Sequence, residues 1–315
     1  MKLLILGSGA MGSLFAGKLT QNGVDVTLFN RSNHHVEAIK KDGLKIIDQH
    51  GNNTTVKLPI ITNPTDLTDN YDMIVVLVKT FATEIVLETV LPFIRSNTPI
   101  LTLQNGIGNM EAIKKMAPQQ EVFVGGTWSG ASVPKPGTIL HQAWGSTFIG
   151  AVESNFNHDL LENIASAFTK SGLDTKVSDN VQSIIWSKLL VNIAYNGLTA
   201  VTRLKNGDAI RLPEGKHILE ELVNEAIKIA KAKNIPLLFD HPVDECIRLG
   251  EEEIGMNTSS MLSDILYERK TEIDAINGAI VEEGKKHSIP TPYNDMLLNL
   301  IKIMENSYSQ MIHPK

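Results

Sequence analysis

The chain has 315 residues, 42% of them hydrophobic, and a formal net charge of -6 at pH 7. Its length is above the usual size of one domain, so two domains are expected. The charges are scattered, which excludes the basic stripe that nucleic acid or an anionic membrane surface would require. The single cysteine, Cys246, excludes an intrachain disulfide framework and a cysteine-rich metal site, and it fits a reducing compartment.

The amino-terminal segment has one lysine before a short apolar run, an arrangement that a secretory signal peptide shares. Gly7 and Gly9 interrupt this run, so we interpret it as a first β-strand. No segment approaches the roughly 20 apolar residues of a membrane helix, and the histidines show no metal-ligand spacing. We therefore expect a cytoplasmic protein without a membrane partner or a bound metal.

Short apolar runs alternate with amphipathic stretches up to about residue 105, which predicts βα units on a parallel sheet. The expected strands are residues 3–6, 24–29, 73–78 and 100–103. Glycines divide residues 122–151 into β-type runs, so we expect hairpins that close this α/β domain. We assign residues 1–175 to it, with a polar hinge at residues 170–174.

Beyond about residue 178, apolar residues recur at helical spacing, so residues 176–315 are expected to form an all-helical domain. Pro213 is expected in the first turn of one helix, and Thr271 resembles the first residue of a capping box. An active site is then expected in the cleft between the two domains, a common place for ligand pockets.

A glycine fingerprint follows the first predicted strand and opens a helix-like stretch. It consists of Gly7, Ser8, Gly9, Ala10, Met11 and Gly12. The first glycine permits a tight turn, the second lets the backbone approach a pyrophosphate, and the third lets the helix pack closely on the sheet. Its position between two predicted strands indicates a dinucleotide site, with phosphate at the amino terminus of the helix.

The end of the second predicted strand, where an NAD site usually has an acidic residue, carries Asn30 and Arg31. A guanidinium pairs with the 2′-phosphate of NADP, whereas a carboxylate would repel it. We therefore favour NADPH over NADH as the cofactor. The alternative is that Arg31 is only a solvated loop residue.

Two further polar positions follow predicted strands, at the sheet edge where open α/β sheets bind ligands. Lys79 follows residues 73–78, and Gln104, Asn105 and Gly106 follow residues 100–103. A lysine and an amide at this edge would face the cofactor or an anionic substrate. For Asn105 and Gly106, a turn that requires positive φ is a comparably good interpretation.

The apolar segment 186–196 places Lys188, Asn192 and Asn196 four residues apart. On an α-helix these three side chains share one face. Buried polar groups without partners are costly, so we interpret them as a ligand-facing row. The alternative is a row that merely faces solvent.

A second polar set occupies residues 257–264, which include Asn257 and Ser260, and precedes Glu272. On one unbroken helix Ser260 and Glu272 would be about 18 Å apart, too far for both to touch a small substrate. We therefore expect the helix to break near residues 269–270, so that the two segments converge. The alternatives are helix capping for the serines and a surface position for Glu272.

Taken in order, these motifs make the chain similar to the ketopantoate reductases, also called 2-dehydropantoate 2-reductases, over essentially its whole length. The shared pattern is the glycine fingerprint, Lys79, the turn at residues 104–106, a W-x-K-x-x-x-N-x-x-x-N helix and the segment 259–278. The resemblance implies a Rossmann-type NADP-binding domain followed by a helical domain like that of 6-phosphogluconate dehydrogenase. Two residues depart from the pattern. The family commonly has alanine at the position of Ser8 and often has proline at the position of Gly197.

By this resemblance Lys188 is the catalytic lysine and Glu272 the active-site carboxylate. The implied substrate contacts are Asn192, Asn196, Asn257 and Ser260. The implied cofactor-side residues are the fingerprint, Arg31, Lys79 and Asn105.

The resemblance implies NADPH-dependent reduction of ketopantoate to (R)-pantoate, a step of pantothenate and coenzyme A biosynthesis, with a homodimer as a candidate assembly. One alternative is an NADP-dependent reductase of another small 2-oxo acid. The other is an NADPH-binding sensor without catalysis, which would leave Lys188 and Glu272 unexplained.

Overall fold

The computed structural model describes residues 1–310 and divides into two compact units. The first unit contains Met1–Gln104 and Asn109–Val181. The second contains the short loop Asn105–Gly108 and the residues from Gln182 onward. Residues 170–174, the segment interpreted as a hinge, connect a helix to a strand inside the first unit.

Strands and helices alternate through the first unit. Its strands are β1 (Lys2–Leu6), β2 (Asp25–Phe29), β3 (Leu44–Ile47), β4 (Asn53–Val56), β5 (Ile60–Ile61), β6 (Met73–Val76), β7 (Ile100–Thr102), β8 (Val122–Thr127), β9 (Gly130–Lys135), β10 (Thr138–Ala143), β11 (Thr147–Ala151) and β12 (Thr175–Val177). Its α-helices are α1 (Ala10–Gln21), α2 (His34–Asp42), α3 (Thr83–Val90), α4 (Asn109–Met116) and α5 (His158–Lys170).

The main sheet of this unit has eight strands in the order β12-β11-β8-β7-β6-β1-β2-β5. All neighbours are parallel except β8 and β11, which pair antiparallel. The four strands expected before residue 105 are confirmed as β1, β2, β6 and β7. They are buried along almost their whole length and mostly apolar, as expected for a parallel sheet that is covered on both faces.

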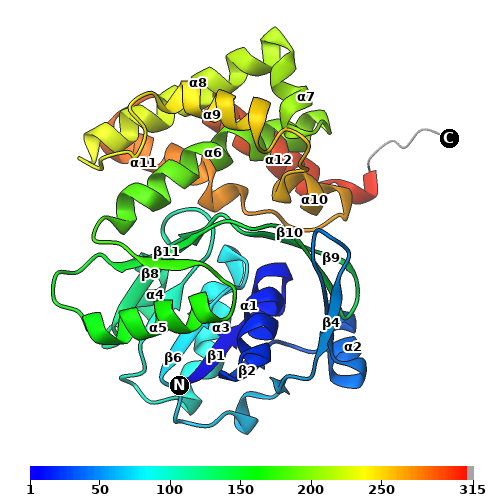
Figure 1. Ribbon diagram of the computed structural model, residues 1–315. Coiled ribbons are helices and arrows are strands. Elements are labelled where there is room, and N and C mark those ends of the chain that lie inside the picture. Colours follow the sequence, from blue (N-terminus) through cyan, green and yellow to red (C-terminus); the bar gives the residue numbers. More distant parts are fainter. Residues whose placement is uncertain (311–315) are drawn as a thin grey trace. The chain divides into compact units, whose positions relative to one another are not determined.

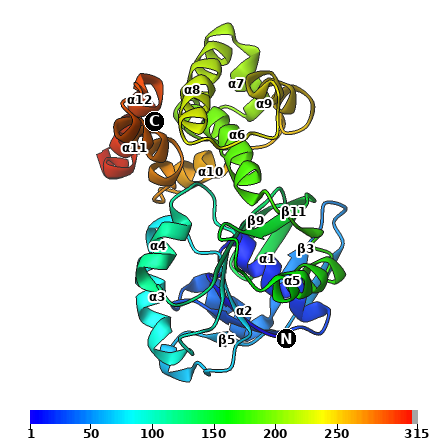
Figure 2. The same cartoon turned by 90° about the vertical axis from the view of Figure 1, so that its left-hand side faces the viewer.

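Helices cover both faces of the main sheet (Figures 1 and 2). On one face α1 and α5 pack together, with the rings of Phe15 and Phe168 edge to face at 5.5 Å between centroids. On the other face α3 and α4 contribute Leu87 and Ile113 to a separate apolar cluster. This three-layer arrangement brings the carboxyl ends of the parallel strands to one edge of the sheet.

A second sheet has four strands in the order β4-β3-β10-β9. The hairpin β9–β10 turns at Pro136 and Gly137, as expected from the glycines in residues 122–151, and β10 also pairs parallel with β3. The sheet packs on α1 through an apolar cluster that includes Leu14, Ile46 and Ile139. Strands β3 and β4 were not expected from the sequence, because they are short and β4 is largely exposed.

The second unit is helical throughout the part of the chain that the structure describes, as expected. Its helices are α6 (Val181–Thr202), α7 (Asn206–Arg211), α8 (Pro213–Ala232), α9 (Pro242–Glu252), α10 (Ser260–Leu266), α11 (Asn277–His287) and α12 (Pro292–Asn306). By length and composition α6 would pass for a membrane-spanning helix, but 72% of its most apolar window is buried. We assign it to the core of this unit, where it packs against α8 and α12.

Two helix boundaries in the second unit were expected from local signals. Pro213 is the first residue of α8, as expected. The chain also breaks after α10, and the short 3-10 helix η4 (Ile273–Ala275) precedes α11. The capping box at Thr271 is wrong: its Oγ1 accepts a hydrogen bond from the Ile273 amide at 3.1 Å in a local turn before η4, and α11 begins only at Asn277.

Candidate active site

The glycine loop between β1 and α1 has the shape of a pyrophosphate site. Gly7 has φ +107°, a conformation that favours glycine, and its amide donates to the Phe29 carbonyl at 2.9 Å. A side chain at Gly12 would overlap the Gly7 carbonyl, whereas a Cβ at Gly9 would meet no atom within 4 Å. No side chain of residues 1–310 caps this end of α1. The open space and the uncapped amides of the first helical turn, Ala10 and Met11 among them, fit a bound phosphate.

Arg31 is exposed in the segment between β2 and α2, and neighbouring amides hold its backbone. The Arg31 carbonyl accepts hydrogen bonds from Asn30 Nδ2 at 2.8 Å and Asn33 Nδ2 at 3.5 Å. Asn30 Oδ1 also accepts from the Ser8 amide at 3.4 Å. The guanidinium therefore extends from a fixed backbone that is bonded to the glycine loop, which fits contact with a 2′-phosphate.

Lys79 and Gln104 follow β6 and β7 at the carboxyl edge of the sheet, as expected. Lys79 is half-buried and lies directly before the short 3-10 helix Thr80–Ala82. Gln104 Nε2 donates to the Val78 carbonyl and to Thr83 Oγ1, both at 2.8 Å. Gln104 is therefore a buried link between the ends of two strands, and its amide hydrogens are used within the protein.

The loop Asn105–Gly108 packs on η4 of the helical unit. Gly106 has φ +79°, which confirms the turn interpretation, and a Cβ there would overlap the Ala275 carbonyl. The Ile107 amide donates to the same carbonyl at 3.1 Å. Glu272 lies directly before η4 and is 7% exposed, so a surface position for it is wrong. The loop is thus held against the turn that follows the carboxylate.

Lys188 lies on α6, half-buried among apolar residues. Its Nζ donates to Asn105 Oδ1 at 2.8 Å. Burial lowers the pKa of Lys188 to about 8, while the charge of Glu272 acts in the opposite direction and raises it. The structure thus brings Lys188, Asn105 and Glu272 together. The sequence interpretation placed Asn105 on the cofactor side, and no local signal could show its bond to a lysine 83 residues away.

The two asparagines that follow Lys188 on α6 continue its face, one and two turns along the helix. Asn192 is half-buried, and Asn196 is 4% exposed. Asn196 Nδ2 finds no hydrogen-bond partner among residues 1–310. A buried donor without a partner destabilises the protein unless a ligand accepts from it, so this amide fits a contact to substrate.

The two serines at the start of α10 divide into one buried and one exposed side chain. Ser259 Oγ accepts from the Leu262 amide at 3.0 Å and from Thr199 Oγ1 at 2.7 Å, so helix capping is confirmed for Ser259. That bond ties the start of α10 to α6. Ser260 and Asn257 are exposed, and their substrate contacts stay predictions.

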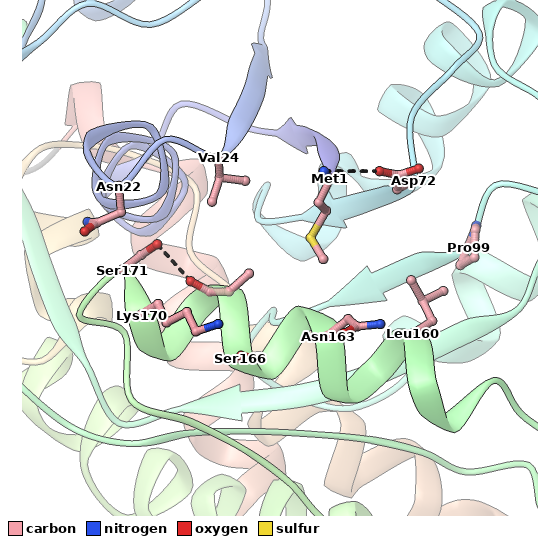
Figure 3. Close-up of a pocket in the computed structure, with 11 residues that line it drawn as sticks. Met1, Asn22, Val24, Asp72, Pro99, Leu160, Asn163, Ser166, Lys170 and Ser171 are labelled. Carbon is pink, nitrogen blue, oxygen red and sulfur yellow. Dashed lines mark hydrogen bonds and ion pairs between the residues drawn. The ribbon is translucent and has the colours of Figure 1, made fainter.

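A pocket of about 530 Å³ in the first unit is lined by none of the site residues named above (Figure 3). Met1, Val24, Asp72 and Pro99 line it, and each directly precedes a strand of the main sheet. The amino-terminal amine lies 3.9 Å from the Asp72 carboxylate. The pocket is therefore at the amino ends of the strands, opposite the edge where open α/β sheets bind ligands.

Comparison with known proteins agrees with the order of motifs. A family model described as ketopantoate reductase PanE/ApbA matches residues 3–154, and the model of its C-terminal domain matches residues 180–305. The chain belongs to the ketopantoate reductase family. A 2-dehydropantoate 2-reductase of Pyrococcus abyssi is 36% identical to this family member over 306 residues, which cover 96% of this chain and 97% of that protein.

The fold of this ketopantoate reductase family member is also found in solved structures of similar proteins. A ketopantoate reductase from Ralstonia eutropha is 28% identical with a TM-score of 0.89, covering 98% of this chain and 100% of that one. A D-mandelate dehydrogenase with NADH and anilino(oxo)acetate is 32% identical with a TM-score of 0.91 and the same coverage. The family assignment makes this protein an oxidoreductase with a dinucleotide-binding fold.

Proposed function

We propose that this protein reduces ketopantoate to (R)-pantoate with NADPH in the cytoplasm, as a step of pantothenate and coenzyme A biosynthesis. The observation that carries the proposal is the Lys188 ammonium, which is bonded to Asn105 and lies within the field of Glu272 on α6, a largely apolar and mostly buried helix. NADPH, when bound, supplies the hydride that the 2-oxo carbon receives.

Lys188 suits the role of general acid. Negative charge develops on the ketone oxygen during reduction, and an ammonium beside that oxygen stabilises the charge and donates the proton. A pKa of about 8 leaves Lys188 mostly protonated at neutral pH but a better proton donor than an ordinary lysine. Asn105 Oδ1 accepts one of the three ammonium hydrogens, so it orients the group and leaves two hydrogens for substrate.

The remaining polar groups of the helical unit supply substrate binding in this proposal. Glu272 accepts a hydrogen bond from the terminal hydroxyl of ketopantoate. Asn192 and Asn196 bind the carboxylate and carbonyl oxygens, which is supported by the buried Asn196 Nδ2 that has no protein partner among the described residues. Ser260 and Asn257 are further substrate contacts, and they carry less support because both are exposed.

Catalysis by Lys188 is tested by replacing it with methionine, which keeps a similar length without the charge. We expect Lys188→Met to lower turnover of ketopantoate by roughly 10²-fold or more, the range for losing a positioned proton donor and oxyanion partner. NADPH affinity should stay near the wild-type value. Lys228→Met on the exposed side of α8 is the matched control and should turn over normally. Near-normal turnover by Lys188→Met would exclude Lys188 as the acid.

The cofactor preference is tested through Arg31, with the fingerprint and Lys79 as the other cofactor-side residues. Arg31→Ala removes a charge-assisted contact to the 2′-phosphate, so we expect NADPH to bind on the order of ten- to a hundredfold more weakly. NADH should bind almost unchanged, because it lacks that phosphate. Dissociation constants for both cofactors at fixed ionic strength measure the effect. Equal weakening of both would show that Arg31 supports the loop and does not select the cofactor.

A second candidate function is supported by the likeness to D-mandelate dehydrogenase: reduction of another 2-oxo acid with an aromatic or branched side chain. A panel of ketopantoate, the 2-oxo acid of mandelate and smaller 2-oxo acids, each with NADPH and NADH, separates the two functions. The highest kcat/KM for ketopantoate with NADPH supports the first proposal. Tight NADPH binding without turnover of any of these acids would instead indicate a sensor.

A further inference from the structure

A chain of hydrogen bonds links the glycine loop to α2 through His35. Ser13 is fully buried on α1, and its Oγ donates to the Ser8 carbonyl at 3.0 Å. His35 Nε2 lies 3.1 Å from Ser13 Oγ, and His35 Nδ1 accepts from the Gly137 amide at 3.0 Å. This series of hydrogen bonds therefore begins at Ser8, the second residue of the fingerprint, and ends at the β9–β10 turn.

The Gly137 contact determines which nitrogen of His35 carries the hydrogen. A backbone amide only donates, so Nδ1 is unprotonated and the neutral ring carries its hydrogen on Nε2. Nε2 then donates to Ser13 Oγ, because the Ser13 hydrogen is already given to the Ser8 carbonyl. Each of these three hydrogens has one acceptor, so His35 has a defined orientation and a defined tautomer.

The segment that carries Arg31 therefore holds Ser8 from both sides. Asn30, directly before Arg31, accepts a hydrogen bond from the Ser8 amide. His35, four residues after Arg31, acts on the Ser8 carbonyl through the Ser13 hydroxyl. Arg31 thus lies between two attachments to the same residue of the glycine loop.

We propose that His35 is a positioning residue that couples the glycine loop, which binds the pyrophosphate, to the Arg31 segment, which binds the 2′-phosphate. The inference rests on the proposed NADPH preference. Without the His35 link, the Arg31 segment keeps only its Asn30 attachment to the glycine loop, so its backbone is held less tightly relative to that loop. NADPH contacts both segments and loses affinity, whereas NADH lacks the 2′-phosphate and is affected less.

The test compares dissociation constants for NADPH and NADH, measured by fluorescence titration of the whole protein at fixed ionic strength. His35→Phe keeps an aromatic ring and removes both nitrogens. We expect it to weaken the binding of NADPH roughly five- to tenfold, the effect of losing one to two hydrogen bonds. The binding of NADH should weaken at most about twofold. In an Arg31→Ala background, His35→Phe should weaken NADPH no more than NADH, because the selective contact is already gone.

Two conservative variants divide the contribution of the two nitrogens and do not depend on His35→Phe folding. Glutamine places an amide donor near the position of Nε2 and can keep the Ser13 bond. Asparagine places its amide near Nδ1 and can keep only the Gly137 bond. His35→Gln should retain more of the preference for NADPH than His35→Asn, and the thermal unfolding midpoint without cofactor should be similar for the two.

The outcomes separate this inference from the proposed function. If the wild type prefers NADPH and His35→Phe weakens both cofactors equally, or His35→Asn retains more preference than His35→Gln, the coupling role of His35 is wrong. In that case the NADPH assignment stands. If the wild type binds both cofactors equally, the NADPH preference itself is wrong, and the coupling role falls with it.

Discussion

At the scale of single residues, the pKa of Lys188 makes a prediction about how activity depends on pH. Burial lowers this pKa to about 8, so the ammonium loses its proton as the pH rises through that value. In the proposed mechanism the reduction requires the protonated form, so kcat/KM should be level near pH 7 and fall above about pH 8. A pH profile of kcat/KM reports this pKa because it reflects groups of the free enzyme. A level profile up to pH 10 would contradict the assignment of Lys188 as the acid.

The charge of Glu272 provides a second test of the pH profile of kcat/KM. Its negative charge raises the pKa of Lys188, against the effect of burial. Glu272→Gln keeps the size of the side chain and removes that charge, so the decline in kcat/KM should begin at a lower pH than in the wild type. If kcat/KM of Glu272→Gln declines at the same pH as that of the wild type, the two groups do not interact in the working enzyme. This conclusion holds even where the variant binds substrate more weakly.

At the scale of elements, the contact between the loop Asn105–Gly108 and η4 predicts opposite results for two glycines of that loop. Gly106 and Gly108 both have positive φ, +79° and +89°, so alanine strains the backbone at each. A Cβ at Gly106 also overlaps the Ala275 carbonyl, whereas one at Gly108 meets nothing within 4 Å. Gly106→Ala should displace Asn105 from Lys188 and lower kcat/KM roughly tenfold or more. Gly108→Ala should cost only about 1 kcal/mol of stability with near-normal kcat/KM.

Steady-state kinetics and thermal unfolding of both variants measure this difference. Similar losses of kcat/KM in Gly106→Ala and Gly108→Ala would mean that backbone strain alone is responsible. The docking of the loop on η4 would then have no catalytic role.

Elements were predictable from the sequence where one local signal dominates. The strands β1, β2, β6 and β7 are short, mostly apolar runs between turn signals, and Pro213 begins α8 because its ring suits a first helical turn. Strand β5 has only two residues, too few to show any periodicity. The capping signal at Thr271 was misassigned because a threonine hydroxyl can also accept from the amide two residues on, as it does here from Ile273, and close a local turn without starting an α-helix.

The candidate site was predictable in its residue types and not in its contacts. The four-residue spacing of Lys188, Asn192 and Asn196 is a local pattern, and α6 confirms it. The bond from Lys188 to Asn105 and the link from Ser8 to His35 join residues far apart in the chain. Such pairs depend on tertiary packing, which no window of the sequence contains. Ser259, the buried capping serine, is distinguished from Ser260 only by the burial that the fold creates.

At the scale of the whole molecule, two histidines of the first unit predict a loss of stability in mild acid. Burial lowers the pKa of His35, and burial and the charge of Lys18 lower the pKa of His141, with Asp48 acting in the opposite direction. Well above 6.5, the ordinary value of a histidine pKa, both rings are neutral in the folded and the unfolded chain. As the pH falls below 6.5, the unfolded chain takes up protons that the folded protein resists, so the free energy of unfolding falls until the folded pKa values have been passed. Carboxylates such as Glu282, whose pKa is lowered by its hydrogen bond to Lys285, act only below about 4.5.

The thermal unfolding midpoint should therefore fall by several degrees between pH 7 and pH 5, before the carboxylates contribute. His141→Phe keeps a ring that can stack on Trp144, where the two ring centroids are 4.1 Å apart, and cannot be protonated. The thermal unfolding midpoint of this variant should fall less over the same pH interval than that of the wild type. His158→Phe, at a side chain that is 58% exposed, provides the matched control for the exchange of histidine for phenylalanine. If His141→Phe and His158→Phe both follow the wild-type curve, protonation of His141 does not contribute to the acid sensitivity of the fold.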